Sequence, residues 1–252
     1  MKKVAIIQAR MNSTRLPGKV LRKINGVTIL GFQVNRIKKS KLIDQLLIAT
    51  STSKSDDVIA DFCMDNEITC FRGSEDDVLD RYYNCAKEYD AEIVIRFCSD
   101  NPLIDPIVID KVIQFYIDSG VDYASNGTPP EKTTFPDGAD LEVFSMTALE
   151  KTHKNTTDLH DREHVTFHMW KYDNGYSLAQ YHQKVNQSEY RFTLDYPEDF
   201  EVVEFIITEL FKRNSFGNLE EIVEILKLNP EIKKKNAHYY YGIGWKNRSQ
   251  VK

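Results

Sequence analysis

Short apolar runs alternate with segments of helical periodicity through the first two thirds of the chain. Four runs have the length and composition of buried strands: Val4–Gln8, Leu46–Thr50, Ile68–Phe71 and Ile93–Phe97. Between them, apolar residues recur at helical spacing, at Val58, Ile59, Phe62 and Cys63 and again at Val78, Leu79, Tyr82, Tyr83 and Ala86. This alternation predicts an α/β fold with a mostly parallel central sheet flanked by helices.

The later part of the chain predicts further elements. Asp105 and Pro106 supply an N-cap and a first-turn proline for a helix whose buried stripe is Val108, Val112, Phe115 and Tyr116. Residues 126–138 are rich in turn residues and long enough to form an active-site loop. The pattern then predicts strands over Ala139–Phe144, Tyr176–Tyr181 and Tyr190–Leu194, and helices over Leu159–Tyr172 and from Pro197 onward.

No repeat, low-complexity linker or composition break divides the chain into independent domains. We therefore expect one domain over residues 1–230, with a small dimerisation or acceptor subregion around residues 126–190. Residues 231–252 form a basic and aromatic tail that begins with Lys233–Lys235 and continues through His238–Trp245. Aromatic and basic residues can stack on nucleic-acid bases, but packing on the same domain or on a second subunit is the favoured interpretation.

Charge and composition exclude several classes of protein. The 33 Lys and Arg residues against 38 Asp and Glu residues give a net charge of −5, which disfavours general nucleic-acid binding. No apolar run approaches the roughly 20 residues of a membrane span, and the first strand is too short for a signal-peptide core, so we expect a cytoplasmic protein. The four cysteines lack a Cys-x-x-Cys pair and are expected to be reduced and mostly buried.

The loop after the first predicted strand, Gln8–Lys19, gathers Arg10, Arg15 and Lys19 around a Pro-Gly turn. Ligands of open parallel sheets bind at the carboxyl ends of the strands, so this loop is placed to bind a polyphosphate. A solvated basic loop is the alternative. The glycine spacings of the Walker A loop and of the dinucleotide fingerprint are both absent, which excludes the two common phosphate-binding loops.

Six ordered blocks carry a family resemblance that extends from about residue 3 to residue 230. They are Gln8–Leu21, Arg72–Tyr82, Asp100–Pro106, Phe135–Phe144, Arg162–Thr166 and Thr193–Asp199. In these blocks the chain resembles the cytidylyltransferase family that includes CMP-Kdo synthetase and acylneuraminate cytidylyltransferases. It is most similar to the branch named after the spore-coat polysaccharide protein SpsF.

The resemblance implies a Rossmann-like nucleotide-diphospho-sugar transferase fold and a specific reaction. A magnesium-dependent enzyme of this kind transfers CMP from CTP to an anionic acceptor and releases pyrophosphate. The acceptor is expected to be an acidic sugar, a sugar phosphate or a phosphonate, used in cell-surface polysaccharide biosynthesis. The resemblance also implies a homodimer. The net charge and the lack of a long apolar run, described above, lead us to expect no nucleic-acid or membrane partner.

The resemblance assigns roles to individual residues. Arg10, Arg15 and Lys19 are expected to act on the triphosphate as the catalytic cations. The other nucleotide-binding residues are expected to be Gln8, Ala9, Ser13, Ser74, Asp80 and Arg81. Asp100 and Asp195 follow predicted strands and are expected to hold magnesium, which prefers carboxylate and phosphate oxygens. A helix cap for Asp195 and a backbone-stabilised turn for Asp100 are the alternatives.

Acceptor-binding residues are expected within two of the blocks. Asp137, Asp140 and Glu142 form either an acceptor site, suited to hydroxyl or amine groups, or a solvated acidic rim. His164 is expected to contact the acceptor or to join a hydrogen-bond network between helices. With His160 and His168 it has the four-residue spacing of a zinc pair, but residue 161 is not the glutamate of the zinc-protease motif.

Two other functions stay open at this point. A glycosyltransferase on a similar fold would carry Asp-x-Asp after a strand, whereas Asp100 is followed by Asn101. A non-catalytic nucleotide-binding module is suggested by the block Cys98–Leu103, where the SpsF-like branch usually reads Thr-Gly-Asp-Cys-Pro-Leu. Because Asp100 is retained and its neighbours differ, this departure bears on the acceptor more than on the chemistry.

Overall fold

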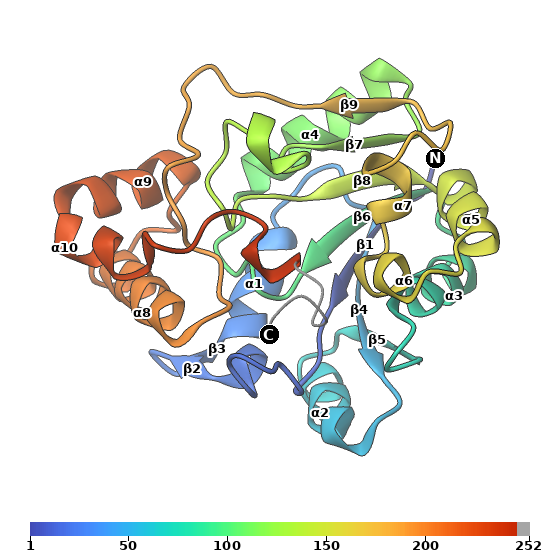
Figure 1. Cartoon of the computed structure of the whole chain (residues 1–252). Coiled ribbons are helices and arrows are strands. Elements are labelled where there is room, and N and C mark those ends of the chain that lie inside the picture. The colour runs from blue at the N-terminus through green and yellow to red at the C-terminus, as the bar shows by residue number, and fades with distance from the viewer. Residues whose placement is uncertain (246–252) are drawn as a thin grey trace, which may run out of the picture.

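A seven-stranded sheet forms the centre of the computed structural model, which describes residues 1–245 (Figure 1). Its strand order is β5-β4-β1-β6-β8-β7-β9. The strands span β1 Lys3–Gln8, β4 Gln45–Ser51, β5 Thr69–Gly73, β6 Ile93–Cys98, β7 Tyr123–Ser125, β8 Glu142–Ser145 and β9 Leu178–Gln180. Strands β5, β4, β1 and β6 run parallel, and β8 alone is antiparallel to its neighbours β6 and β7. The predicted mostly parallel α/β fold is confirmed.

Helices cover both faces of the sheet. They are α1 Ile29–Ile37, α2 Asp57–Asp65, α3 Val78–Glu88, α4 Pro106–Ser119, α5 Met146–Asn155, α6 Leu159–His164, α7 Phe167–Trp170, α8 Pro197–Lys212, α9 Leu219–Leu228 and α10 Pro230–Lys233. A small hairpin of β2 Lys23–Ile24 and β3 Val27–Thr28 precedes α1.

Side chains of β1 alternate between two buried clusters, one on each face. Ala5 and Ile7 pack with residues of α1, α4, α8 and α9, and Val4 and Ile6 pack with residues of α3, α5 and α7. All four are fully buried, which explains why the strand is apolar throughout rather than alternating with polar residues.

The four strands β1, β4, β5 and β6 lie where the sequence pattern predicts them, whereas the later strands differ. The predicted strand Ala139–Phe144 begins only at Glu142, and Tyr190–Leu194 forms a single bridge, from Arg191 to Asp137. Gly138 explains the difference. Its φ of 113° turns the chain, and it packs so closely that an added Cβ would lie 2.5 Å from the backbone nitrogen of Thr193.

The predicted helix Leu159–Tyr172 is broken into α6 and α7. Val165 separates them with a φ of 63°, a strained conformation for a β-branched residue, and its side chain is fully buried. The break lets the hydroxyl of Thr166 donate to a carboxylate oxygen of Glu142 at 2.6 Å. Helical periodicity alone gives no signal for such a break.

The predicted helix cap at Asp105 is confirmed, whereas the prediction that most of the cysteines are buried holds for only two of the four. The carboxylate of Asp105 caps α4 by accepting from the backbone N–H of Ile107 at 2.7 Å. The four cysteines are free thiols, of which Cys63 and Cys85 are buried.

None of the helices within residues 1–245 is long and apolar enough to cross a membrane. Of the aromatic tail, residues 246–252 lie outside the described residues.

Candidate active site

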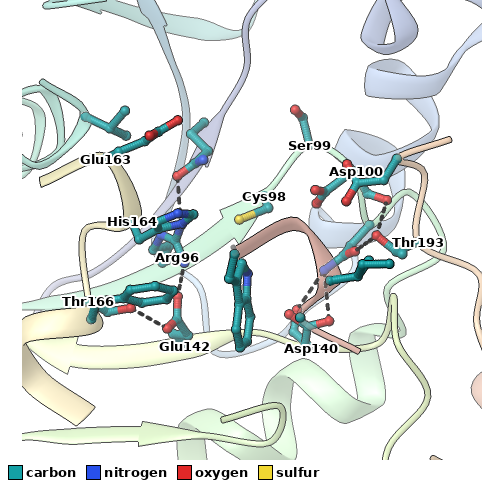
Figure 2. A pocket seen from close by; sticks show the side chains of 18 of the residues that line it. Arg96, Cys98, Ser99, Asp100, Asp140, Glu142, Glu163, His164, Thr166 and Thr193 are labelled. Atoms are coloured by element: carbon teal, nitrogen blue, oxygen red, sulfur yellow. Dashed lines mark hydrogen bonds and ion pairs between the residues drawn. The ribbon is translucent and has the colours of Figure 1, made fainter. Parts of the chain in front are cut away.

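A cavity of about 1310 Å³ opens at the carboxyl ends of β1 and β6 (Figure 2). Its walls come from the loop after β1, residues 96–101, the segment leading into β8, helices α6 and α7, residues 191–196 and residues 240–245. The cavity contains most of the predicted site residues: Gln8, Ala9, Arg10, Ser13, Arg15, Lys19, Arg81, Asp100, Asp137, Asp140, Glu142, His164 and Asp195.

The loop after β1 folds back over the end of the sheet. The carbonyl of Met11 accepts hydrogen bonds from the backbone N–H groups of Ser13 and Gly18, both at 2.9 Å. The N–H of Met11 in turn donates to the buried carboxylate of Asp56 at 2.7 Å. Gly18 then takes a φ of 68°, and the chain enters a short turn that starts at Lys19. These contacts fold the loop back, so that its end at Lys19 lies near the carboxyl ends of the strands.

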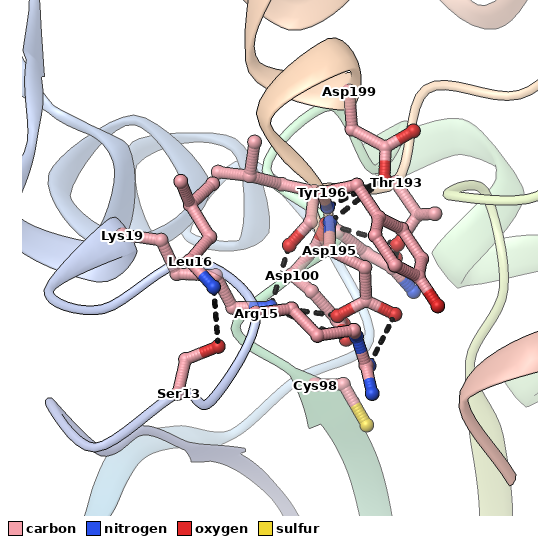
Figure 3. Close-up of polar contacts among 12 residues, drawn as sticks. Ser13, Arg15, Leu16, Lys19, Cys98, Asp100, Thr193, Asp195, Tyr196 and Asp199 are labelled. Atoms are coloured by element: carbon pink, nitrogen blue, oxygen red, sulfur yellow. Dashed lines mark hydrogen bonds and ion pairs between the residues drawn. The ribbon is translucent and has the colours of Figure 1, made fainter. Parts of the chain in front are cut away.

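Arg15 and Lys19 meet the predicted metal ligands at one point (Figure 3). Lys19 Nζ lies 2.9 Å from Asp195 Oδ1 and 3.9 Å from Asp100 Oδ2. It also donates to the carbonyl of Leu194 at 2.5 Å. Arg15 Nη2 lies 3.0 Å from the other carboxylate oxygen of Asp195. Four charged groups predicted from three separate blocks therefore form one cluster.

Burial and charge act in opposite directions on the two carboxylates. Burial raises the pKa of Asp100, the positive charge of Lys19 opposes this only in part, and the negative charge of Asp195 adds to the rise. Burial also acts to raise the pKa of Asp195, but Lys19 and Arg15 hold it below its ordinary value. Each carboxylate thus stands in a site where added positive charge is favourable.

The structure bears differently on the two alternative roles, a helix cap for Asp195 and a backbone-stabilised turn for Asp100. Asp195 does not cap α8, because Asp199 Oδ2 accepts from the backbone N–H groups of Asp195 and Tyr196, both at 2.9 Å. Asp199 is itself held by Arg191 at 2.7 Å. Asp100 does take a hydrogen bond from its own backbone, and it also faces Lys19 in the cavity.

The third cation of the loop faces another wall of the cavity. Arg10 Nη2 lies 3.8 Å from Glu163 Oε1 on α6, and its side chain is 38% exposed. Arg10 therefore lines the same cavity as Arg15 and Lys19 but does not join their cluster with Asp195.

Of the predicted residues on α3 and its leading turn, only Arg81 lines the cavity. Its Nη1 donates to the carbonyl of Ser74 at 2.5 Å, and its buried Nε has no hydrogen-bond partner within residues 1–245. Ser74 thus positions Arg81 from outside the cavity lining. Asp80 points away, with Oδ1 2.8 Å from His153 Nε2 and Oδ2 accepting from Asn84.

The acidic residues near β8 are not a solvated rim. Glu142 is 6% exposed and pairs with Arg96. Asp137 pairs with Arg191. Asp140 has no cationic partner within residues 1–245. Its Oδ1 accepts from Asn101 Nδ2 at 3.1 Å and from the backbone N–H of Gly138 at 3.3 Å.

Burial and the nearby charge of Asp100 raise the pKa of Asp140 to about 6. Asp140 is therefore the acidic group of this wall whose charge is left for a ligand. Glu142, in contrast, is fully engaged, since it also accepts from the hydroxyls of Tyr123 at 2.7 Å and Thr166 at 2.6 Å.

The three histidines do not form a zinc site. His164 stacks on Phe167 with ring centroids 4.3 Å apart, and the edge of His160 packs against it at 4.5 Å. Burial lowers the pKa of His164 to about 3, and electrostatic interactions with His160 and Arg96 add to the effect. His168 lies beyond the break at Val165, where its Nδ1 faces Asp161 at 3.8 Å.

Within residues 1–245, converging ligand atoms occur instead at Asp158, His160 and Asp161. Asp158 Oδ1 already caps α6 by accepting from the backbone N–H groups of the other two residues, at 2.9 and 3.0 Å. The N-cap of α6 therefore explains why these three residues lie close together.

Comparison with known proteins decides the family. The sequence model described as cytidylyltransferase matches residues 4–245. The chain belongs to the cytidylyltransferase family. The spore coat polysaccharide biosynthesis protein SpsF of Bacillus subtilis (strain 168) is 31% identical over 90% of this chain and 94% of its own length. The resemblance of the six sequence blocks is thereby confirmed.

Solved structures agree with this assignment. A cytidylyltransferase from Leptospira borgpetersenii serovar Hardjo-bovis superposes with a TM-score of 0.87 at 30% identity, covering 95% of this chain and 100% of its own. CMP:2-keto-3-deoxy-manno-octonic acid synthetase complexed with CTP shares the fold, with a TM-score of 0.63 at 15% identity over 83% of this chain and 99% of its own. The protein is thus a CTP-dependent nucleotidyltransferase.

Two features of the cytidylyltransferase site were missed from the sequence. Arg96 lies in the cavity wall, where its Nη2 donates to Gln8 Oε1 at 3.1 Å and its Nη1 pairs with Glu142. A lone cation inside the apolar run Ile93–Phe97 was the available signal. Tyr241 and Trp245 of the aromatic tail also line the cavity, and no local pattern places them there.

Proposed function

We propose that this enzyme transfers CMP from CTP to an anionic acceptor and releases pyrophosphate. The observation that carries the proposal is the cluster of Arg15, Lys19, Asp100 and Asp195 in one cavity at the strand ends. Membership of the cytidylyltransferase family supplies the nucleotide and the reaction class. An acceptor oxygen attacks the α-phosphorus of CTP in line with the departing pyrophosphate.

The loop cations hold the triphosphate. Arg15 exchanges its contact with Asp195 for phosphate oxygens, and Lys19 presents its charge to the phosphates while it keeps its contact with Asp195. Arg10 contacts the phosphates from the side of α6. Gln8, at the end of β1, and Ala9 and Ser13, in the loop, also line the cavity and are proposed to bind the nucleotide. Charge builds up on the leaving pyrophosphate, and fixed cations in a site shielded from water stabilise it without covalent help.

Arg81 is proposed to bind the nucleotide on the opposite wall. Its unpaired, buried Nε supports this role, because an unsatisfied donor in a buried position costs free energy until a ligand accepts from it. Ser74 keeps Arg81 in place, and Asp80 supports α3 from the far side through His153 and Asn84.

Asp100 and Asp195 are proposed to hold Mg²⁺. The donor set fits the ion, because both groups are hard carboxylate oxygens and both already share a cation in Lys19. Bound magnesium would neutralise phosphate charge and orient the phosphates. Lys19 bridges the two carboxylates and keeps them in the cavity, and Asp199 fixes the backbone that carries Asp195.

The acceptor is proposed to bind beside Asp140, on the wall away from the loop cations. Asp137, Glu142 and His164 shape that wall, each held by the contacts described above. An acidic sugar fits the names of two similar proteins, a spore coat polysaccharide biosynthesis protein and a synthetase of CMP-2-keto-3-deoxy-manno-octonic acid. Use of the product in cell-surface polysaccharide synthesis is part of the proposal.

We also propose that the enzyme is a cytoplasmic homodimer. The cytoplasmic location is supported by the need of the enzyme for the cell's supply of CTP. For the dimer, the edge strand β9 and its surroundings expose Tyr172, Leu178 and Val185 to 47%, 45% and 63%. Light scattering coupled to size-exclusion chromatography tests it, and a monomer at micromolar concentration would overturn it.

The glycosyltransferase alternative receives no support. Asn101 is 4% exposed, donates to Asp140 and accepts from the hydroxyl of Thr193 at 2.9 Å. It is an amide committed to a hydrogen-bond network, so it does not replace the second carboxylate of an Asp-x-Asp metal motif.

Pyrophosphate release from CTP and Mg²⁺ tests the proposal. The acceptor panel is 3-deoxy-manno-octulosonate, glycerol 3-phosphate and 2-aminoethylphosphonate, with UDP-sugar binding as the comparison. We expect release with one acceptor and its loss in Asp100→Asn, while Asp118→Asn, an exposed residue of α4, stays active. The proposal fails if CTP with Mg²⁺ neither supports release nor raises the melting temperature.

A further inference from the structure

The aromatic C-terminal segment, residues 239–245, crosses the mouth of the cavity and reaches into it. In Figure 1 it is the last red stretch of ribbon, beside the carboxyl ends of the parallel strands. In Figure 2 the same reddish ribbon runs between Cys98 and Asp140. Tyr240, Tyr241, Gly242, Ile243 and Trp245 all line the cavity. We call this segment the C-terminal strap.

The start of the strap is fastened to the first turn of α8. The ring of Tyr239 stacks on Tyr196 with centroids 3.9 Å apart and planes 9° from parallel. Its hydroxyl donates to a carboxylate oxygen of Glu198 at 3.1 Å. Tyr196 also lies under the guanidinium of Arg15, which ties the strap to the cation cluster.

The end of the strap is fastened to the opposite wall. The carbonyl of Trp245 lies 3.0 Å from His160 Nε2. The indole ring packs against Phe167 and Trp170, with centroids 5.5 and 5.7 Å away. Rings at these separations contact one another directly, so they form a packed anchor.

Tyr241 lies between the two anchors and is directed into the cavity. An added Cβ on Gly127 would lie 2.2 Å from the Tyr241 hydroxyl and 2.6 Å from Asp140 Cβ, so both residues meet at the same place. The hydroxyl is hydrogen-bonded to Asp140, and burial with this carboxylate nearby raises the pKa of Tyr241 well above its ordinary value. Tyr241 is therefore a neutral donor at physiological pH.

The partners of the three acidic residues in this wall differ in charge. Arg191 neutralises Asp137, and Arg96 neutralises Glu142. Asp140 receives only neutral donors within residues 1–245, namely Asn101, the Gly138 N–H and Tyr241. A carboxylate with neutral donors only retains its charge for a further hydrogen-bond donor. A hydroxyl group of a ligand supplies that donor without bringing another negative charge.

We infer that Tyr241 is a specificity-determining residue of the acceptor subsite, carried there by the C-terminal strap and paired with Asp140 to bind a hydroxyl group of the acceptor. This inference rests on the proposed function. It predicts that the acceptor is polyhydroxylated near its nucleophilic oxygen, as a sugar acid is, and that 2-aminoethylphosphonate, which lacks a hydroxyl, is a poor acceptor.

The first test compares Tyr241→Phe with Tyr89→Phe, a matched loss of a hydroxyl at a half-buried position outside the cavity lining. With 3-deoxy-manno-octulosonate as acceptor, Tyr241→Phe is expected to raise the acceptor KM about tenfold, the effect of one hydrogen bond to a charged group. The KM for CTP is expected to stay within twofold of the wild type. An unchanged acceptor KM, or an equal rise in both KM values, overturns the role of Tyr241.

The second test follows the strap without any acceptor. The chain has two tryptophans, Trp170 and Trp245, whose ring centroids lie 5.7 Å apart, close enough to give a coupled signal in the near-ultraviolet circular dichroism. We expect Trp245→Phe to abolish that signal and Tyr241→Phe to keep it, which shows that the strap is seated in the Tyr241 variant. A wild-type spectrum equal to the sum of the two single-tryptophan variants overturns the seated strap.

The two tests separate failure of the inference from failure of the proposed function. If CTP with Mg²⁺ does not stabilise the wild type, the proposed function fails whatever the strap does. CTP is expected to stabilise the wild type and Trp245→Ala equally, while the acceptor KM of Trp245→Ala is higher than that of the wild type. That result would place the strap at the acceptor subsite, as inferred. If Trp245→Ala leaves the acceptor KM unchanged, the inference fails and the nucleotide site stands.

Discussion

Lys19 Nζ lies 2.9 Å from a carboxylate oxygen of Asp195, a residue 176 positions later in the chain. The side chain of Lys19 is 9% exposed and that of Asp195 16% exposed, so the pair is largely removed from water. Breaking a buried ion pair by removing one partner leaves an uncompensated charge. Lys19 therefore has two tasks, because it keeps Asp195 and Asp100 together and it presents a cation to the triphosphate.

Lys19→Gln is expected to impair catalysis and stability together. Loss of one preorganised cation in such a site lowers kcat by roughly 10²–10³-fold. The melting temperature is also expected to fall, because Asp195 keeps only Arg15 as a cationic partner within residues 1–245. Steady-state pyrophosphate release and thermal unfolding measure the two effects.

Lys184→Gln, at an exposed position outside the cavity lining, is the matched control for Lys19→Gln. It should leave both measurements unchanged. A Lys19→Gln enzyme with wild-type kcat would contradict the assignment of Lys19 to the triphosphate.

Asp140→Asn is expected to stabilise the protein, and to do so only above acidic pH. The pKa of Asp140 is raised to about 6 from 3.8, so the folded state holds this proton more tightly than the unfolded state does. Well below pH 3.8 the carboxyl of Asp140 is protonated in both the folded and the unfolded state, and the amide gains nothing. As pH rises through 4 to 6, ionisation costs the wild type stability that the variant keeps, up to about 3 kcal/mol at roughly 1.4 kcal/mol per pKa unit.

Urea unfolding of both proteins in EDTA, at intervals from pH 4 to pH 8, measures this difference for Asp140→Asn. EDTA removes divalent cations, whose charge would otherwise lower the pKa of nearby carboxylates. A difference in stability that is constant across this range would contradict the raised pKa.

His164 is expected to remain neutral in the folded protein and to make it acid-sensitive. Burial lowers its pKa to about 3, whereas the unfolded chain takes up the proton near 6.5. As pH falls from 6.5 toward 3, stability is therefore lost at up to about 1.4 kcal/mol per pH unit from this group alone. His164→Phe preserves stacking on Phe167 and should remove that part of the slope. A His164 ring that titrates near pH 6.5 by NMR would contradict the expectation.

Local patterns predicted the elements whose formation depends on their own sequence. The run of buried residues in β1 and the Asp105 cap are set within a few positions, and both were found as expected. The break at Val165 was not predicted, because it is decided by the fit of Thr166 against Glu142. The strand predicted at Ala139 fails for the same kind of reason, since Gly138 packs against a distant segment.

The residues of the candidate site likewise fall into two groups, those that the sequence predicted and those that it did not. Arg15, Lys19 and Asp100 were placed near one another because parallel strands bring their carboxyl ends to one edge. Asp195 was assigned by the family resemblance, since the strand predicted before it forms only a single bridge. Asp80 lies on the wrong side of α3, which the helical spacing around it did not reveal. The tail was expected to pack on its own domain or on a second subunit, and residues 239–245 do pack on the domain. Their place in the cavity was not predicted, because a tail can pack in many places and only its contacts decide which.

Gly138→Ala is expected to destabilise the protein by about 3 kcal/mol or more, which exceeds the ordinary cost of a positive φ. Its Cβ would lie 2.5 Å from the backbone nitrogen of Thr193 and 2.7 Å from the carbonyl carbon of Phe192, and backbone atoms cannot move aside cheaply. Gly26→Ala is the matched control, because Gly26 also has a positive φ, of 82°, but no atom within 4 Å of the added Cβ. We expect it to cost only about 1 kcal/mol. Urea unfolding of the two variants separates conformational strain from steric clash. Equal losses would mean that the chain around residues 137–140 yields to the methyl group, and that Asp140 is less rigidly placed than its contacts indicate.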